Sequence, residues 1–295
     1  MTSAPRGLGR WFSLVKFSHS VFALPFALIG AWLATGGVPE LRVCALVVVA
    51  AVAARTAAMA FNRWVDRDID AANPRTAGRE IPAGLLRPGA VLALVLVASA
   101  VFVATAFLLN PLCGFLSFPV LFVLLFYSVV KRFSWLAHAV LGLSLGLAPL
   151  GAWLAVRGDF EGDLLVPIAL AATVLTWVAG FDLIYACQDA GFDREAKLHS
   201  VPSRFGIPAA LRLSSLLHVV TIALLGLVAW RAELGPIFWA AVAVAALLLL
   251  WQHRLVAPDD FSRVNLAFFT LNGWVSIGLF VGTALDLAVR SGGVA

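Results

Sequence analysis

The sequence predicts an all-α, polytopic membrane protein, and three observations lead to that prediction. Of the 295 residues, 62% are hydrophobic and only 13% are charged, whereas a soluble domain is about half apolar and about a quarter charged. The mean hydropathy is +0.97. The apolar residues gather in about nine runs of membrane-spanning length. Because the bilayer organises such a fold, we expect residues 1–295 to form a single transmembrane domain, not the two that length alone suggests.

Each predicted element is an apolar run of about 20 residues, the length that a transmembrane helix needs. The predicted spans are 17–35, 41–65, 88–108, 111–130, 134–156, 164–190, 207–230, 234–252 and 265–289. Asn110 and Pro111 leave only a short turn between the third and fourth spans, which predicts a tight hairpin. Pro25, Pro119 and Pro149 fall inside spans, where neighbouring groups can satisfy the freed backbone carbonyls.

The basic residues predict the orientation in the membrane. Most of the 21 Lys and Arg residues fall on the side of the N-terminus. The exceptions are Arg42, Arg157, Arg231 and Arg290 on the other side and Arg55 inside a span. Because cytoplasmic loops carry an excess of Lys and Arg, we expect a cytoplasmic N-terminus and an extracytoplasmic C-terminus.

The net charge of +5 and the pI of about 9.6 do not indicate a nucleic-acid partner. The basic residues stand in connectors between apolar runs, as the membrane orientation requires, and no basic surface lies free of the membrane. We therefore expect the lipid bilayer, and no nucleic acid, as a partner.

Two connectors, residues 66–87 and 190–206, are long, polar and charged. Both fall on the predicted cytoplasmic side. Loops that are attached to rigid helices are where binding and catalytic residues concentrate. The sequence therefore predicts a site that faces the cytoplasm.

A polar stripe precedes the first of these loops. Arg55, Asn62, Asp66 and Asp70 are separated by seven, four and four residues. A step of seven residues along a helix returns to within ~20°, and a step of four to within ~40°. The four side chains share one face if the helix continues to Asp70. Asp68 points away from that face and is expected to be a solvated acid.

A second stripe, Asp182, Asp189 and Asp193, ends the sixth span with the same spacing. Acids at this depth are costly unless they face a bundle interior or a wet cavity. Oxygen ligands without a nearby His or Cys cluster suit a hard cation such as Mg²⁺. The alternative to a metal site is that these are ordinary helix-end acids in contact with solvent. The same spacing in two stripes on one predicted side of the membrane favours the metal site.

Cationic side chains that could bind phosphate oxygens lie on the same predicted side. Lys131 and Arg132 end the fourth span, and Arg75, Arg79 and Lys197 lie in the two polar loops. These five residues are our candidates for diphosphate binding, and Arg132 is the strongest, because it ends a span that must pack beside the acidic helices. For a loop arginine or lysine, a role as an anchor at the membrane surface is the alternative.

Arg55 lies about two helical turns deeper than Asn62, where an unpaired guanidinium is expensive. It needs a carboxylate as a partner, from the protein or from a bound substrate. Asp182 lies at the matching depth on the other stripe and is the candidate within the protein.

These motifs resemble those of the UbiA superfamily of intramembrane prenyltransferases. The segment 62–70, NRWVDRDID, is similar to the family's NxxxDxxxD motif, and 182–193, DLIYACQDAGFD, is similar to its second motif with an upstream Asp. The loops 73–84 and 198–206 and the basic end of the fourth span, 127–132, also resemble the family. The resemblance covers essentially the whole chain and its about nine spans.

The resemblance implies a helical bundle around a central cavity, with catalysis at the two acidic motifs. The implied Mg²⁺ ligands are Asn62, Asp66, Asp70, Asp189 and Asp193. Lys131 and Arg132 would bind the diphosphate of a polyprenyl diphosphate, and Arg132 joins the four acids as a catalytic residue. Arg55 and Asp182 match positions near the aromatic acceptor. The prenyl tail would leave the cavity into lipid.

Within the family, residues 185–200 resemble 4-hydroxybenzoate polyprenyltransferases, and above all a bacterial branch that prenylates 1,4-dihydroxy-6-naphthoate in menaquinone synthesis. The implied function is prenyl transfer to one of these aromatic carboxylates in ubiquinone or menaquinone biosynthesis, in a bacterial plasma membrane. Lys197 departs from the glycine expected in this branch.

His138 lies outside these motifs, and we expect it to have a structural role.

Two other functions remain as alternatives. A haem- or chlorophyll-type prenyltransferase shares the acidic motifs. A transporter can also carry intramembrane acids, but it would place them near the bilayer midplane, whereas these acids stand at helix ends on one side.

Overall fold

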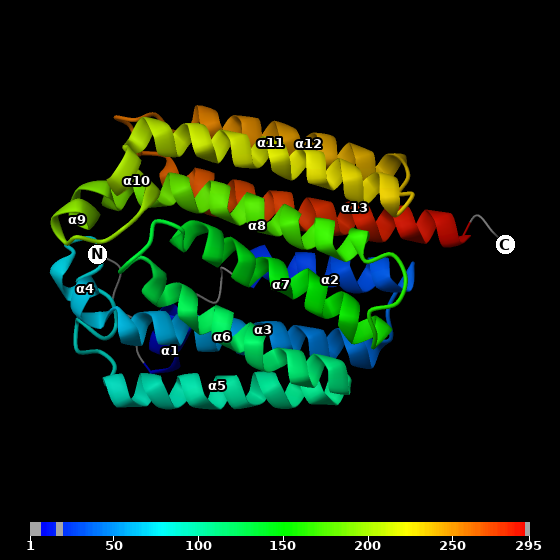
Figure 1. The fold of residues 1–295 in the computed structure, drawn as a ribbon, viewed down its shortest axis with the longest axis horizontal. Helices are drawn as coiled ribbons and strands as arrows, with labels where there is room; N and C mark the ends of the chain where they lie inside the picture. Colours follow the sequence, from blue (N-terminus) through cyan, green and yellow to red (C-terminus); the bar gives the residue numbers. More distant parts are fainter. Residues whose placement is uncertain (1–6, 16–19, 293–295) are drawn as a thin grey trace.

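The computed structural model describes residues 7–15 and 20–292. Its long helices run side by side along the longest axis (Figure 1). They are α2 (Ser20–Thr35), α3 (Leu41–Val65), α5 (Pro88–Leu109), α6 (Pro111–Val130), α7 (Ala137–Arg157), α8 (Leu165–Ala186), α11 (Ile207–Arg231), α12 (Pro236–Arg254) and α13 (Asn272–Gly292). No strand occurs among the described residues, and the predicted all-α fold is confirmed.

Eight of these helices are long and apolar enough to cross a membrane. The exception is α2, whose apolar part, Ala23–Thr35, is shorter. The first predicted span began at residue 17, and residues 17–19 lie outside the described part of the chain. The expectation of about nine spans thus corresponds to eight full-length helices and one shorter apolar helix. The chain is an integral membrane protein.

Short helices gather at one end of the bundle. α4 (Arg67–Ala72) follows α3, and α9 (Ala190–Glu195) and α10 (Val201–Phe205) follow α8; all three lie at the same end (Figure 1). A further short helix, α1 (Leu8–Leu14), packs through Leu14 against Ala60 of α3 and Val91 of α5. The two polar loops predicted from the sequence are therefore brought together by helices that begin far apart in the chain.

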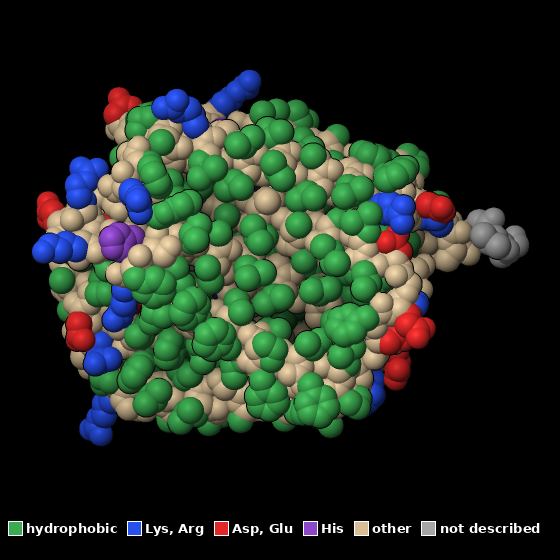
Figure 2. All heavy atoms as spheres, viewed as in Figure 1, with side chains coloured by type: hydrophobic (Ala, Val, Ile, Leu, Met, Phe, Trp, Pro, Cys, Tyr) green, Lys and Arg blue, Asp and Glu red, His purple; other side chains and the backbone are tan. Residues whose placement is uncertain are grey.

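The surface fits a membrane environment. On the face drawn in Figure 2, hydrophobic side chains cover the middle of the bundle, and most Lys and Arg side chains stand at the end that carries α4, α9 and α10. Large apolar side chains such as Phe115, Phe122 and Leu247 are more than half exposed. Such a surface is costly in water and favourable against lipid.

Small residues allow the central helices to approach closely. A Cβ atom on Gly142 of α7 would overlap the carbonyl oxygen of Leu175 in α8, and one on Gly146 would lie 2.6 Å from the carbonyl oxygen of Ala171. α2 also approaches α7 closely, because a Cβ atom on Gly30 of α2 would overlap the carbonyl oxygen of Pro149. Inside a membrane the hydrophobic effect does not drive helices together, because lipid tails are as apolar as the side chains. Close packing of this kind stabilises helix association instead.

Candidate active site

The first acidic motif lies at a break between two helices. α3 ends at Val65, and Asp66 adopts φ −93° and ψ 5° before α4 begins at Arg67. The continuous helix to Asp70 on which the shared stripe depended does not form. The break turns α4 while Asp66 and Asp70 stay buried, with 2% and 3% of their surface exposed. Asp68 points outward with 85% of its side chain exposed, as expected.

Asp66 is surrounded by donors from α3 and from the end of α6. Asn62 donates from Nδ2 to Oδ2 of Asp66 at 3.1 Å. Arg132 donates to Oδ1 at 3.1 Å and also to the carbonyl oxygen of Val65 at 2.7 Å. Lys131 Nζ lies 3.5 Å from Oδ2. The basic end of α6 therefore stands directly on the first motif.

Asp70 is held by the loop that follows it. Arg79 donates to Oδ1 at 2.6 Å, and the hydroxyl of Thr76 donates to the backbone carbonyl of Asp70 at 3.0 Å. The second carboxylate oxygen, Oδ2, is buried and has no hydrogen-bond partner. An unpartnered buried carboxylate oxygen is costly, so this atom is available to a cation or a donor that enters the site.

The loop after α4 also reaches the second acidic motif. Arg75 donates from Nε to Oδ1 of Asp189 at 2.8 Å and makes a second, very short contact from Nη2 to Oδ2. Nη1 donates to the hydroxyl of Tyr185 at 3.1 Å, and Asn73 donates to Asp189 at 3.2 Å. Burial lowers the pKa of Arg75, but the hydrogen bonds and charge of Asp189 outweigh burial and raise that pKa. This arginine stays charged.

Asp193 and the loop after it complete this end of the bundle. Asp193 is buried in α9, and its backbone carbonyl accepts a hydrogen bond from the amide of Leu198 at 2.7 Å. The amide of His199 donates to the carbonyl of Lys131 at 2.7 Å, which ties the second polar loop to the end of α6. Ser200 caps α10 through a reciprocal pair of bonds with Ser203.

Lys197 does not join this network. It is exposed, forms no ion pair within the described residues, and has a φ of +55°. The left-handed backbone region favours glycine, which gives a physical reason why the resemblance led us to expect glycine at this position.

Arg55 and Asp182 do not pair with each other. Asp182 instead contacts His138, whose Nδ1 lies 2.7 Å from Oδ2 of the carboxylate. The reason is packing: α7 lies directly on α8 through its glycines, so His138 is within reach of Asp182. Arg55 has a buried Nε without a partner and forms no ion pair among the described residues. The candidate partner for Arg55 that sequence reasoning named was wrong.

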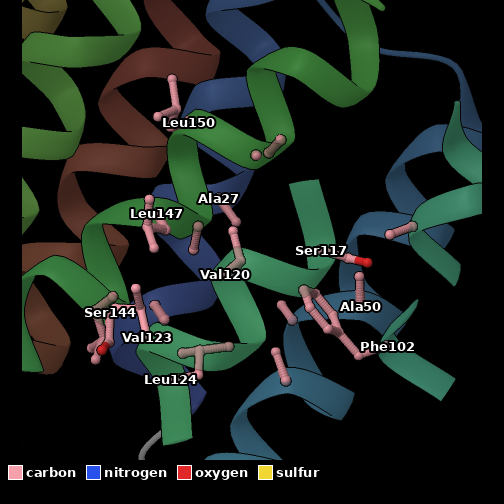
Figure 3. Close-up of a pocket in the computed structure, with 18 of the residues that line it drawn as sticks. Ala27, Ala50, Phe102, Ser117, Val120, Val123, Leu124, Ser144, Leu147 and Leu150 are labelled. Carbon is pink, nitrogen blue, oxygen red and sulfur yellow. The ribbon is translucent and has the colours of Figure 1, made fainter. Parts of the chain in front are cut away.

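A large apolar cavity begins at Arg55. Its volume is about 450 Å³, and it lies between α2, α3, α5, α6 and α7. Ala27, Phe102, Val120, Val123 and Leu147 line its wall (Figure 3). It extends along α6 and α7 to Cys113 and Leu154 near the opposite end of those helices. A long apolar chain fits such a space.

The acids and their cations form two groups at one end of the bundle, and sequence reasoning missed several of their partners. Asn73, Tyr185 and His138 contact the predicted acids, and Arg63 is buried at 5% exposure with an unpartnered Nε. From the sequence, Arg63 is one of the many basic residues on the predicted cytoplasmic side, and nothing in its spacing marks it as part of the site. The signal for His138 was its place at the start of the fifth span, at the depth where the antiparallel sixth span carries Asp182.

No three Asp, Glu, His or Cys side chains in the described part of the chain converge on one metal position. Three of the predicted ligands, Asp66, Asp70 and Asp189, form ion pairs instead, with the basic residues Arg75, Arg79, Lys131 and Arg132. The donor set nevertheless suits Mg²⁺, because it consists of carboxylate and amide oxygens and includes the unpartnered Oδ2 of Asp70. Assembly of a metal site requires these acids to exchange partners.

This chain is similar to known proteins in both sequence and fold. Residues 23–274 match the UbiA prenyltransferase family. The chain is 31% identical over 288 residues to a 4-hydroxybenzoate octaprenyltransferase of Azoarcus sp. (strain BH72), covering 95% of this chain and 96% of that protein. A 4-hydroxybenzoate octaprenyltransferase of Pseudomonas aeruginosa (strain UCBPP-PA14) is 30% identical over 259 residues, covering 88% and 86%.

Solved structures agree with this relationship. The apo structure of a UbiA homolog from Aeropyrum pernix K1 has a TM-score of 0.82 and 35% sequence identity, covering 91% of this chain and 98% of that one. A UbiA homolog from Archaeoglobus fulgidus bound to DMAPP and Mg²⁺ has the same fold, with a TM-score of 0.73 and 18% identity over 95% and 99% of the chains. The chain therefore belongs to the UbiA prenyltransferase family and is an integral membrane prenyltransferase.

Proposed function

We propose that this prenyltransferase moves a polyprenyl group from its diphosphate to an aromatic carboxylate, either 4-hydroxybenzoate or 1,4-dihydroxy-6-naphthoate, in the synthesis of a respiratory quinone. One arrangement carries the proposal: acids and cations gather at one end of the bundle, and an apolar cavity between the helices is lined by Arg55, which forms no ion pair among the described residues. The curated relatives that act on 4-hydroxybenzoate support the choice of acceptor class.

Mg²⁺ is the proposed cofactor, held by Asn62, Asp66, Asp70, Asp189 and Asp193. The oxygen-only donor set and the free Oδ2 of Asp70 support this assignment. When bound, the metal neutralises the negative charge that builds on the departing diphosphate. Bound Mg²⁺ in the Archaeoglobus homolog of the same fold agrees with the choice of ion.

The cations that now hold the acids are proposed to bind the diphosphate. Arg75, Arg79, Lys131 and Arg132 already lie within 4 Å of the acids, and they can turn to phosphate oxygens once metal neutralises those acids. Guanidinium groups stabilise the charge of the leaving group as the allylic carbon–oxygen bond breaks. Lys197, although exposed here, would reach the same group from the second loop.

Arg55 is proposed to bind the carboxylate of the aromatic acceptor. It lies seven residues, or about 10 Å along α3, below Asn62, so a ring whose carboxylate contacts Arg55 extends toward the reacting diphosphate. The Nε atom of Arg55 is buried and has no protein partner, and an anion in the cavity would satisfy it. The apolar wall of the cavity keeps water from the allylic cation and holds the prenyl tail.

We further propose that the enzyme works in a bacterial plasma membrane with its site toward the cytoplasm. The excess of Lys and Arg at the end that carries α4, α9 and α10 supports this orientation. The diphosphate and the aromatic acid, both water-soluble at their polar ends, would then enter from the cytoplasm.

The test is a transfer assay in detergent with a polyprenyl diphosphate and Mg²⁺, in which both acceptors are offered in parallel. We expect one prenylated aromatic acid, and no product after EDTA. Product from only one acceptor identifies the pathway. If the protein binds the diphosphate but prenylates neither acid, the acceptor assignment fails, and haem- and chlorophyll-type acceptors are the next to examine.

A further inference from the structure

Buried His138 forms a pair with partly exposed Asp182 that the function proposed above leaves unused. His138 lies at the start of α7 with only 8% of its side chain exposed, and its Nδ1 is 2.7 Å from Oδ2 of Asp182 in α8. The Asp182 side chain is 23% exposed. A carboxylate that orients an imidazole through one ring nitrogen leaves the other nitrogen free for chemistry.

The other nitrogen of His138, Nε2, is buried and has no hydrogen-bond partner. A buried polar atom without a partner costs about 1 to 3 kcal/mol, and few such atoms occur among the described residues. Because Asp182 accepts a hydrogen bond, Nδ1 carries the proton, and in the neutral ring Nε2 is then a free acceptor. The pair therefore presents an oriented proton acceptor with nothing in the protein to satisfy it.

The position of His138 relates it to the acceptor end of the cavity. Leu141 and Leu145 follow it by three and seven residues on α7, so they share its side of the helix to within about 60°, and both line the cavity that Arg55 also lines. His138 is also close enough to Asp193 for their charges to interact. His138 therefore lies on the side of α7 that carries two cavity-lining residues, and near the second acidic motif.

We propose that His138 is a catalytic residue whose Nε2 accepts the hydroxyl proton of the aromatic acceptor, with Asp182 as the positioning residue. The inference rests on the proposed function, because it requires a phenolic acceptor. Arg55 binds the carboxylate at one end of the ring, and His138 binds the hydroxyl at the other. Loss of the hydroxyl proton makes the neighbouring ring carbon electron-rich, where the new bond forms.

The proton and electron count closes without another reactant. The hydroxyl proton moves to Nε2, and Asp182 stabilises the imidazolium. The allylic carbon–oxygen bond breaks with its electron pair on the diphosphate, and the ring carbon beside the oxygen forms the new carbon–carbon bond. That carbon then loses its hydrogen as a proton to the released diphosphate. His138 finally returns its proton to the ring oxygen, which restores the phenol and the neutral imidazole.

The decisive variants are His138→Gln and Asp182→Asn, with His253→Gln as the matched control. Glutamine can accept a hydrogen bond from the hydroxyl but cannot hold the proton. The control removes a histidine of α12 that contacts His218, in another part of the bundle. Thermal unfolding, and binding of a non-reactive prenyl thiolodiphosphate with Mg²⁺, would show that each variant keeps its fold and its diphosphate site.

We expect His138→Gln to lower kcat by roughly 100-fold, the range of general acid–base catalysis, with diphosphate binding unchanged. Its rate should rise about tenfold per pH unit, because a phenol with a pKa near 10 then ionises only through solvent. A ring-fluorinated 4-hydroxybenzoate, whose hydroxyl is more acidic, should reduce the difference in kcat between wild type and variant. Asp182→Asn should show the same changes in weaker form.

Wild-type rates and an unchanged pH profile in His138→Gln would overturn the inference and leave the proposed function intact. If His138→Gln lowers turnover and the fluorinated acceptor does not reduce the difference in rate from wild type, His138 has a packing role only. That result would also overturn the inference. If wild-type protein binds the thiolodiphosphate but prenylates no phenolic acid, the proposed function itself fails, and the role of His138 falls with it.

Discussion

The guanidinium of Arg75 lies on the carboxylate of Asp189, which stands 114 residues further along the chain. This contact joins the loop after the first acidic motif to the end of α8 and so brings the two motifs to one site. Arg75→Lys should break the two-point contact, because an ammonium cannot bind a carboxylate in the same forked geometry. We expect a roughly tenfold higher KM for the diphosphate, measured by initial rates. Arg67→Lys, which alters an arginine that contacts exposed Asp68, the ring of Trp64 and a backbone carbonyl, and none of the predicted metal ligands, should behave as wild type.

The two buried acids that carry the metal assignment can be tested by removal. Asp66→Ala and Asp189→Ala should each abolish prenyl transfer through loss of Mg²⁺-dependent diphosphate binding. The protein should still insert and fold, because the side chains of the cations that face these acids are 32% to 40% exposed to solvent. Asp68→Ala is the control, since its side chain is exposed. Near-normal turnover in either buried variant would contradict the metal site.

Two substitutions at Lys197 distinguish the effect of backbone strain on stability from a role of this side chain in diphosphate binding. With φ at +55°, Lys197→Gly should raise the free energy of unfolding by about 1 kcal/mol relative to Lys197→Ala, because only glycine adopts this region without cost. Thermal unfolding in detergent measures the difference. If Lys197 binds the diphosphate, both variants should raise its KM equally; an unchanged KM in both removes Lys197 from the diphosphate site.

The contact between α7 and α8 predicts a large effect from one methyl group. Gly146→Ala would place a Cβ atom 2.6 Å from the carbonyl oxygen of Ala171, and overpacking of this kind costs about 1 to 3 kcal/mol. We expect a lower midpoint of thermal unfolding and, because α7 carries His138, lower activity. Gly278→Ala has open space around the added atom and should change neither. Equal stability of the two variants would show that α7 and α8 can move apart cheaply.

Membrane orientation is testable with fusions. A reporter fused after Ala295 should read extracytoplasmic, and one inserted in the loop between Asn73 and Arg87 should read cytoplasmic, since Lys and Arg concentrate on that side. A cytoplasmic reading after Ala295 would reverse the proposed topology and place the site on the other face.

Much of the fold followed from the sequence because apolar runs of bilayer length leave the backbone no alternative to a helix. The hairpin turn at Asn110 is an example, where the side chain caps α6 by accepting from the amide of Cys113. The break at Asp66 was not predicted. Helical spacing extends smoothly through this residue, and the turn into α4 is stabilised by contacts with Arg132, which lies just after α6.

The sequence by itself determined that this chain spans a membrane, which family it belongs to, and which acids and cations its motifs contain, because each of these is a matter of composition and local spacing. Only the tertiary structure decided which side chains form pairs. Asp182 pairs with His138 and not with Arg55, since the glycines of α7 let that helix lie against α8. Partner choice between separate helices depends on how closely they pack, and no spacing along one helix contains that information.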